Sequence, residues 1–151
     1  MKTLFYFCCL SLLFGACQKK STSSSDQAAT DKTIITNYIS SHHLTASSTA
    51  DGLYYVINNP GTGVRPTSSS NVTVIYKGYL TNGTVFDQNP GGFSCSLTSV
   101  IQGWQEGIPL FKAGGSGTLL IPSALGYGSQ ATGSIPANSV LIFDITLVSV
   151  P

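Results

Sequence analysis

The second half of the chain alternates between short hydrophobic runs and clusters of turn-forming residues. From Leu53 onward, runs rich in Val, Ile, Leu, Thr and Tyr are separated by Gly, Pro, Asn and Ser. Runs of this kind are typical of strands in an antiparallel sheet, because the strands are short and the turns between them need these residues. The pattern predicts four strands, at residues 53–57, 72–80, 118–121 and 140–150.

Two of these runs have hydrophobic residues at every second position. Because successive side chains of a strand point to opposite faces of the sheet, the alternation predicts which residues face the core. These are Val72, Val74 and Tyr76 in the first run and Leu141, Phe143, Ile145 and Leu147 in the second. The Asn82–Gly83 pair follows the first run and predicts a chain reversal, since this dipeptide suits a tight hairpin turn.

Two other segments have helical periodicity. Hydrophobic residues recur at spacings of three and four over residues 34–44, which predicts a short amphipathic helix that packs on the domain that follows. Residues 100–111 form the second segment, and Pro109 limits it to one or two turns. The elements together predict an α+β fold, in which an antiparallel sheet wraps over one short α-helix and a short N-terminal helix precedes it.

The first 17 residues have the features of an export signal. Lys2 is followed by an apolar run from Leu4 to Phe14, which is shorter than the ~20 residues of a membrane-spanning helix. Cys17 comes after two small residues, and this ending resembles the lipobox of bacterial lipoproteins, although Phe14 departs from the usual pattern. We therefore predict lipidation at Cys17, and ordinary secretion with an incidental cysteine is the alternative.

The composition of the rest of the chain predicts its division into segments and excludes one class of partner. Residues 18–32 hold no aromatic or branched aliphatic side chain, which predicts a flexible Ser/Thr-rich tether, followed by a helical segment and linker at 33–50 and the domain at 51–151. Only 9% of residues are charged and the net charge is +1, so we expect no nucleic-acid partner.

Few residues are available for acid–base, nucleophilic or metal chemistry. The chain has two histidines, six acidic residues and no GxSxG, CxxC, HExxH or P-loop motif, so we expect no metal and no cofactor. Cys95 is the only cysteine of the mature chain beyond Cys17, and a lone cysteine in an apolar run is usually a small core residue. Aromatic side chains set among glycines are plentiful instead, and they suit either a plain core or a pocket for an apolar ligand.

Four sequence segments favour the pocket over the plain core. VTVIYKGYLTNGTVFD from Val72, VIQGWQEGIPLFKAGG from Val100, TLLIPSALGYG from Thr118 and SIPANSVLIFDITLV from Ser134 resemble the FKBP-type peptidyl-prolyl cis-trans isomerases, in order and at similar spacing. The resemblance spans about 100 residues. It implies a half β-barrel wrapped around one short helix.

The resemblance also implies a substrate pocket. It assigns catalytic positions to Tyr76, Asp87, Ile101, Trp104, Tyr127 and Phe143, with Trp104 as the floor, and substrate-binding positions to Phe86, Phe93, Val100 and Ile135. For Asp87 the alternative is a turn-forming residue after a strand. Cys95 and Leu125 depart from the family, which often has Phe and Tyr there, and we interpret both as packing changes.

The resemblance implies an enzyme that isomerises X-Pro bonds in exported proteins, without a cofactor. Its partners are then proline-containing polypeptides, macrolides of the tacrolimus type and, through a lipid anchor, a membrane. We expect a monomer on the outer membrane, facing the periplasm of a diderm bacterium. Two alternatives are a binding module that holds proline-containing segments with little turnover, and a structural surface lipoprotein without pocket selectivity.

Overall fold

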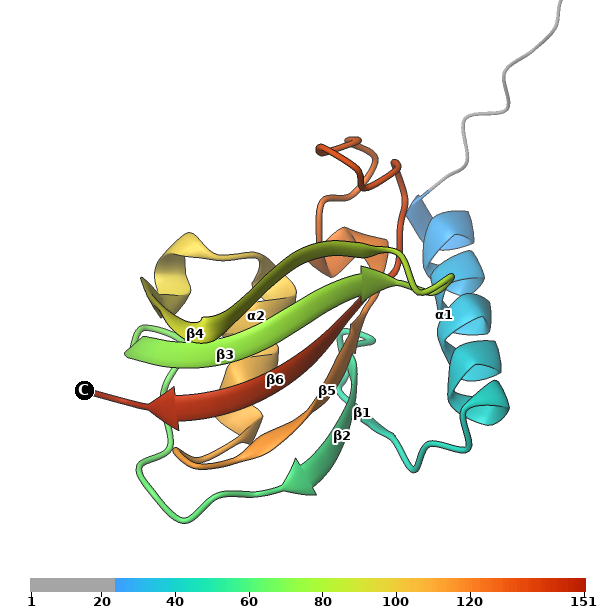
Figure 1. The fold of residues 1–151 in the computed structure, drawn as a ribbon. Helices are drawn as coiled ribbons and strands as arrows, with labels where there is room; N and C mark the ends of the chain where they lie inside the picture. Colours follow the sequence, from blue (N-terminus) through green and yellow to red (C-terminus); the bar gives the residue numbers. More distant parts are fainter. Residues whose placement is uncertain (1–23) are drawn as a thin grey trace, which may run out of the picture.

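A computed structural model describes residues 24–151, and the predicted signal and Cys17 lie outside the described residues. Figure 1 shows a curved sheet with one short helix, α2, against one face and a longer helix, α1, beside the turn that joins β3 to β4. The helices are α1 (Ser24–Ser41) and α2 (Gln102–Gly107). The strands are β1 (Ser47–Ser48), β2 (Tyr54–Asn59), β3 (Asn71–Leu80), β4 (Val85–Ser96), β5 (Ser116–Ile121) and β6 (Leu141–Ser149). Three short 3-10 turns lie at Leu97–Ser99, Ile108–Leu110 and Ser123–Leu125.

The six strands form one antiparallel sheet in the order β1-β2-β5-β6-β3-β4. The four predicted strands are confirmed as β2, β3, β5 and β6. The predicted α+β class is confirmed as well, since the open sheet wraps over α2. No described helix is long and apolar enough to cross a membrane.

Alternation in β6 places its side chains as predicted. Leu141, Phe143, Ile145 and Leu147 are buried in the main core, whereas Asp144 and Val148 are exposed. The predicted reversal after β3 is also confirmed. Gly83 has a φ of +87°, and the Leu80 backbone N–H donates to the Thr84 carbonyl at 2.9 Å, which closes the turn.

Helix α2 lies very close to β5 because two glycines face the strand. A Cβ built on Gly103 would come within 2.5 Å of the Ile121 side chain, and one on Gly107 within 2.5 Å of Leu119. Any larger residue at either position would push the helix away from the sheet. This close contact holds the aromatic residue between them, Trp104, against the inner face of the sheet.

Helix α1 differs from its predicted bounds. It begins at Ser24, ten residues before Ile34, so residues 24–32 are helical and do not form part of a tether. Its packing on the following domain is confirmed, since Ile35 is fully buried in a second cluster with Leu120 and Val140. Leu120 faces α1 while its neighbours in β5 face α2, so the two helices contact opposite faces of that strand.

Strand β4 is the sheet edge that the sequence did not predict. It contains Pro90, Gly91 and Gly92, which disfavour strands, but an edge strand tolerates them because one side needs no hydrogen-bond partner. The register with β3 shifts twice, between Val74 and Tyr76 and between Gly78 and Tyr79. These irregularities let β4 curve over α2.

Candidate active site

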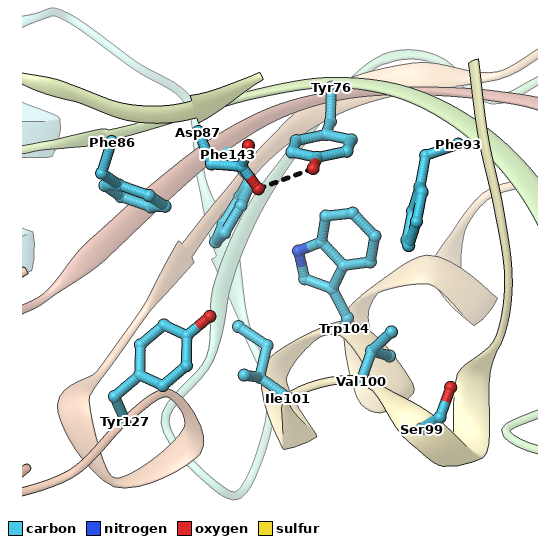
Figure 2. A pocket seen from close by; sticks show the side chains of 10 residues that line it. All are labelled: Tyr76, Phe86, Asp87, Phe93, Ser99, Val100, Ile101, Trp104, Tyr127 and Phe143. Carbon is cyan, nitrogen blue, oxygen red and sulfur yellow. Dashed lines mark hydrogen bonds between the residues drawn. The ribbon is translucent and has the colours of Figure 1, made fainter. Parts of the chain in front are cut away.

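A pocket of about 300 Å³ opens between the inner face of the sheet and the N-terminal end of α2 (Figure 2). β3, β4 and β6 supply one wall, residues 99–104 supply the base, and the loop after the Ser123–Leu125 turn supplies the opposite side. The lining residues are Tyr76, Phe86, Asp87, Phe93, Ser99, Val100, Ile101, Trp104, Tyr127 and Phe143.

Aromatic rings in the pocket pack edge to face around Trp104. The Trp104 ring centroid lies 5.0 Å from that of Tyr76 and 5.3 Å from that of Phe143, at interplanar angles of 82° and 78°. This geometry is favourable because the positive edge of one ring meets the negative face of another. Trp104 is only 4% exposed, so its ring is held in place before any ligand arrives.

Gly78 makes room for the outer part of this cluster. A Cβ at this position would lie 2.6 Å from the Phe86 ring and 2.7 Å from the Phe143 ring. With glycine there, the two rings meet at 5.4 Å between centroids and 81° between planes. A strand residue without a side chain is therefore what allows two phenylalanines to share one wall.

The one acidic residue of the lining is joined to a tyrosine. The Tyr76 hydroxyl donates a hydrogen bond of 2.7 Å to Asp87 Oδ2, as drawn in Figure 2. Burial raises the pKa of Tyr76 well above its ordinary range, and the bond and the charge of Asp87 raise it further. The phenol thus stays protonated at neutral pH and remains a donor. Asp87 lies inside strand β4, so the alternative that it forms a turn after a strand is wrong.

Tyr127 reaches the pocket from a loop. The residue is 38% exposed, and Figure 2 shows its hydroxyl end directed into the pocket, across from Phe143. Gly126 and Gly128 flank it, and Gly128 has a φ of +60°, a conformation that favours glycine. The loop thus brings a polar group to the mouth of an apolar site.

The part of the chain that builds this pocket matches a family model. Residues 63–148, more than half of the 151-residue chain, match the model of the FKBP-type peptidyl-prolyl cis-trans isomerases. The chain belongs to this family. The resemblance inferred from the four sequence segments is confirmed.

Individual FKBP-type relatives agree with the family match. The FKBP-type isomerase FkpA of Buchnera aphidicola subsp. Schizaphis graminum is 46% identical over 108 residues, covering 69% of this chain and 43% of that protein. The crystal structure of FkpA from Escherichia coli superposes with a TM-score of 0.72 at 34% identity, over 83% of this chain and 62% of that one. A peptidyl-prolyl isomerase structure from Pseudomonas syringae gives a TM-score of 0.74 at 29% identity, over 85% and 96%. The chain spans about two-fifths of the length of the curated relatives it matches.

The FKBP-type fold brings together nine of the ten residues that the sequence assigned to the pocket. Ile135 is the tenth, and the structure places it in the main core at 5% exposure, paired with Thr132 in a small β-bridge. Ser99 lines the pocket and was not predicted. Its hydroxyl donates to the Ser96 carbonyl at 2.8 Å, which stabilises the turn before α2, and a lone serine in such a turn carries no signal of a site.

The remaining reactive side chains lie outside the lining. Cys95 is a free thiol opposite Val72 in the β3–β4 ladder, and burial raises its pKa, so the nucleophilic thiolate is disfavoured. Within residues 24–151, no three His, Cys, Asp or Glu side chains gather in a way that could hold a metal ion. The pocket lining itself consists mainly of apolar and aromatic side chains, with Asp87, Ser99 and the tyrosine hydroxyls as its polar groups.

Proposed function

We propose that the protein accelerates cis–trans isomerisation of X-Pro bonds in polypeptides. The observation that carries this proposal is the ring of aromatic side chains around Trp104, which leaves an apolar space of about 300 Å³ with few polar groups at its rim. A proline ring is compact and apolar and fits such a space. The family membership supports the same reaction.

The reaction needs no nucleophile and no proton transfer. Rotation about a peptide bond loses its resonance, with a barrier of about 18–20 kcal/mol, and the twisted amide is less dipolar than the planar one. An apolar pocket that excludes water therefore stabilises the twisted amide relative to the planar substrate. Binding energy from the proline ring and its neighbours then lowers the barrier, because it is realised most fully in the transition state.

Nine of the ten lining residues have a part in this scheme. Trp104 supports the proline ring, with Tyr76, Phe86, Phe93 and Phe143 around it and Val100 at its side. The Tyr127 hydroxyl and the Ile101 backbone N–H donate hydrogen bonds to substrate carbonyls on either side of the rotating bond. Asp87 fixes the Tyr76 ring by accepting its hydroxyl bond.

An isomerase assay on the full chain tests the proposal. The substrates are tetrapeptides that contain an X-Pro bond, and a protease that cleaves only the trans form reports the isomerisation. Catalysis appears as an increase in the isomerisation rate in proportion to protein concentration. A macrolide of the tacrolimus type is expected to compete, since the family resemblance implies that such ligands occupy the same pocket. Binding of proline peptides without any increase in rate would instead favour the adaptor function.

We also propose an exported lipoprotein, on the basis of residues 1–17. Cys17 is the lipidated residue, and the protein is a monomer anchored to the outer membrane, facing the periplasm of a diderm bacterium. The wild-type chain is expected in the detergent phase with the membrane fraction, and Cys17→Ser is expected to release it or to leave it unprocessed. Unmodified wild-type protein in the soluble periplasm would contradict the anchor.

A further inference from the structure

Asp31 is a buried carboxylate on α1 that lies outside the pocket lining. It is 1% exposed and accepts three hydrogen bonds from uncharged donors. Oδ2 accepts from the Ser123 backbone N–H at 2.8 Å and from the Ser123 hydroxyl at 2.6 Å. Oδ1 accepts from Gln27 Nε2 at 2.7 Å, one turn earlier on the same helix. The carboxylate thus joins α1 to the segment between β5 and β6.

Ser123 in turn binds the two residues beside Tyr127. Ser123 is 2% exposed, and its carbonyl oxygen accepts from the backbone N–H of Gly126 at 3.0 Å and of Gly128 at 2.8 Å. These two glycines are the immediate neighbours of Tyr127. The backbone N–H groups of the residues before and after the tyrosine are therefore both bound to one carbonyl, and that carbonyl belongs to the residue that Asp31 holds.

We propose that Asp31 is a positioning residue for the Tyr127 hydroxyl, and that it acts through Ser123. This inference rests on the proposed isomerase function, in which that hydroxyl donates to the substrate. Tyr127 as a whole residue is 38% exposed, so side-chain packing restrains it weakly and its position depends on its backbone. Two glycines adjoin it, and glycine has the largest backbone freedom of any residue. Without the bonds to Ser123 this segment would sample many conformations.

A carboxylate suits this task better than an apolar side chain. One oxygen atom accepts both the N–H and the hydroxyl of Ser123, which fixes the position of that residue and its rotation. Attaching α1 to the domain does not require it, because Ile35 and its neighbours already bury an apolar stripe of the helix. Burying a carboxylate costs free energy unless its bonds are satisfied, so the site is satisfied only with Ser123 in this one arrangement.

The test compares variants of the full chain by kcat and KM and by amide hydrogen exchange at Gly126 and Gly128. Asp31→Ala is expected to lower kcat/KM about two- to tenfold, the loss that one misplaced hydrogen bond produces, and to lower protection of both glycine amides. In a Tyr127→Phe background, Asp31→Ala is expected to cause no further loss in kcat/KM. The two losses must coincide, because both remove the same hydroxyl bond.

Three controls separate positioning from a general loss of stability. Asp31→Asn is expected to stay within about twofold of wild type, because the amide oxygen can accept both Ser123 bonds and the amide NH₂ can donate to a turned Gln27. Ile39→Ala weakens α1 packing away from Asp31, and it is expected to lower the melting temperature without the change at Gly126 and Gly128. Ser123→Ala keeps the hydrogen bond from the residue 123 backbone N–H to Asp31, so it is expected to give a smaller loss of kcat/KM. This variant replaces Asp31→Ala in the test if Asp31→Ala does not fold.

Specific results would overturn the inference. One is a folded Asp31→Ala protein with the kcat/KM of the wild type. Another is a double variant of Asp31→Ala and Tyr127→Phe in which the two losses of kcat/KM multiply. An equal loss in Ile39→Ala at matched stability would show that α1 matters only for folding. If the wild-type chain shows no isomerase activity, the proposed function fails, and unchanged exchange at Gly126 and Gly128 in Asp31→Ala would separately refute the positioning.

Discussion

Comparing Phe143→Ala with Tyr127→Phe tests whether the pocket acts through its apolar walls. Phe143 is 4% exposed, and its ring lies 5.3 Å from that of Trp104 and 5.4 Å from that of Phe86. Alanine at this position removes a wall and admits water to the site. Phenylalanine in place of Tyr127 keeps the ring and removes one hydroxyl at the rim.

The expected losses differ in size. We take the contact between the Phe143 wall and the bound proline to bury the apolar surface of two or three methylene groups. Losing that contact raises the activation free energy by about 2 kcal/mol, or lowers kcat/KM about 30-fold. The Tyr127 hydroxyl contributes one hydrogen bond, worth about 0.5–1.5 kcal/mol, or about two- to tenfold. Phe143→Ala also lowers the free energy of unfolding by about 3–5 kcal/mol, because it leaves a cavity among packed rings.

The assay must therefore separate activity from folding. Both variants are measured by the protease-coupled assay well below their melting temperatures, with the folded fraction taken from circular dichroism. Leu147→Ala is the matched control, since Leu147 is fully buried in the same strand but does not line the pocket. It is expected to lose about 2–5 kcal/mol of stability and to retain kcat/KM per folded molecule.

One outcome would refute the reasoning. If Tyr127→Phe costs more kcat/KM than Phe143→Ala in equally folded proteins, the hydroxyl takes part in chemistry that an apolar wall does not explain. The same conclusion would follow if Leu147→Ala and Phe143→Ala lost activity equally. In that case the ring of Phe143 would act only as core.

Four further predictions concern the pH dependence of activity and of stability, the helix α1 and the thiol. Activity is expected to be flat between pH 6 and 8, since no lining residue is a histidine, and a bell-shaped profile would contradict this. Because folding raises the pKa of Tyr76 and Tyr79, mainly through burial, the stability that they contribute is complete below about pH 10 and is lost above it, so urea midpoints should fall there. Ile35→Ala is expected to lower the free energy of unfolding by about 2–5 kcal/mol, and an unchanged melting curve would show that α1 does not stabilise the domain. Cys95→Ser is expected to fold and to be fully active, and inactivation with the fold intact would revive covalent chemistry.

The strands could be predicted where one face is buried and the other exposed. From Phe143 to Val148 in β6, buried residues alternate with more exposed ones, so Phe143 could be assigned to the inner face from the sequence alone. In β4 this signal fails, because Pro90 and two glycines interrupt it and the register shifts against β3. An edge strand with bulges has no regular pattern to read. Its three pocket residues, Phe86, Asp87 and Phe93, were found only through the family resemblance.

The pocket itself was predictable as a set of residues but not as a shape. Resemblance supplied the aromatic positions, but the closeness of their rings depends on Gly78, whose missing side chain admits both Phe86 and Phe143. The same resemblance placed Ile135 at the pocket, whereas here it is buried in the core. A loop residue that can turn inward or outward by a small backbone change cannot be assigned from a motif.

The beginning of α1 was missed because its buried stripe includes a charge. Asp31, Ile35 and Ile39 are four residues apart, so they follow one face of the helix as apolar residues of a core helix do. Composition alone favoured a solvated Asp31, since carboxylates are almost never buried without partners. The partner is Ser123, 92 positions away, and only the fold brings it near. A carboxylate at a position where the helical period demands an apolar residue is therefore a usable signal, and it indicates that the helix contacts a hydrogen-bond donor elsewhere in the domain.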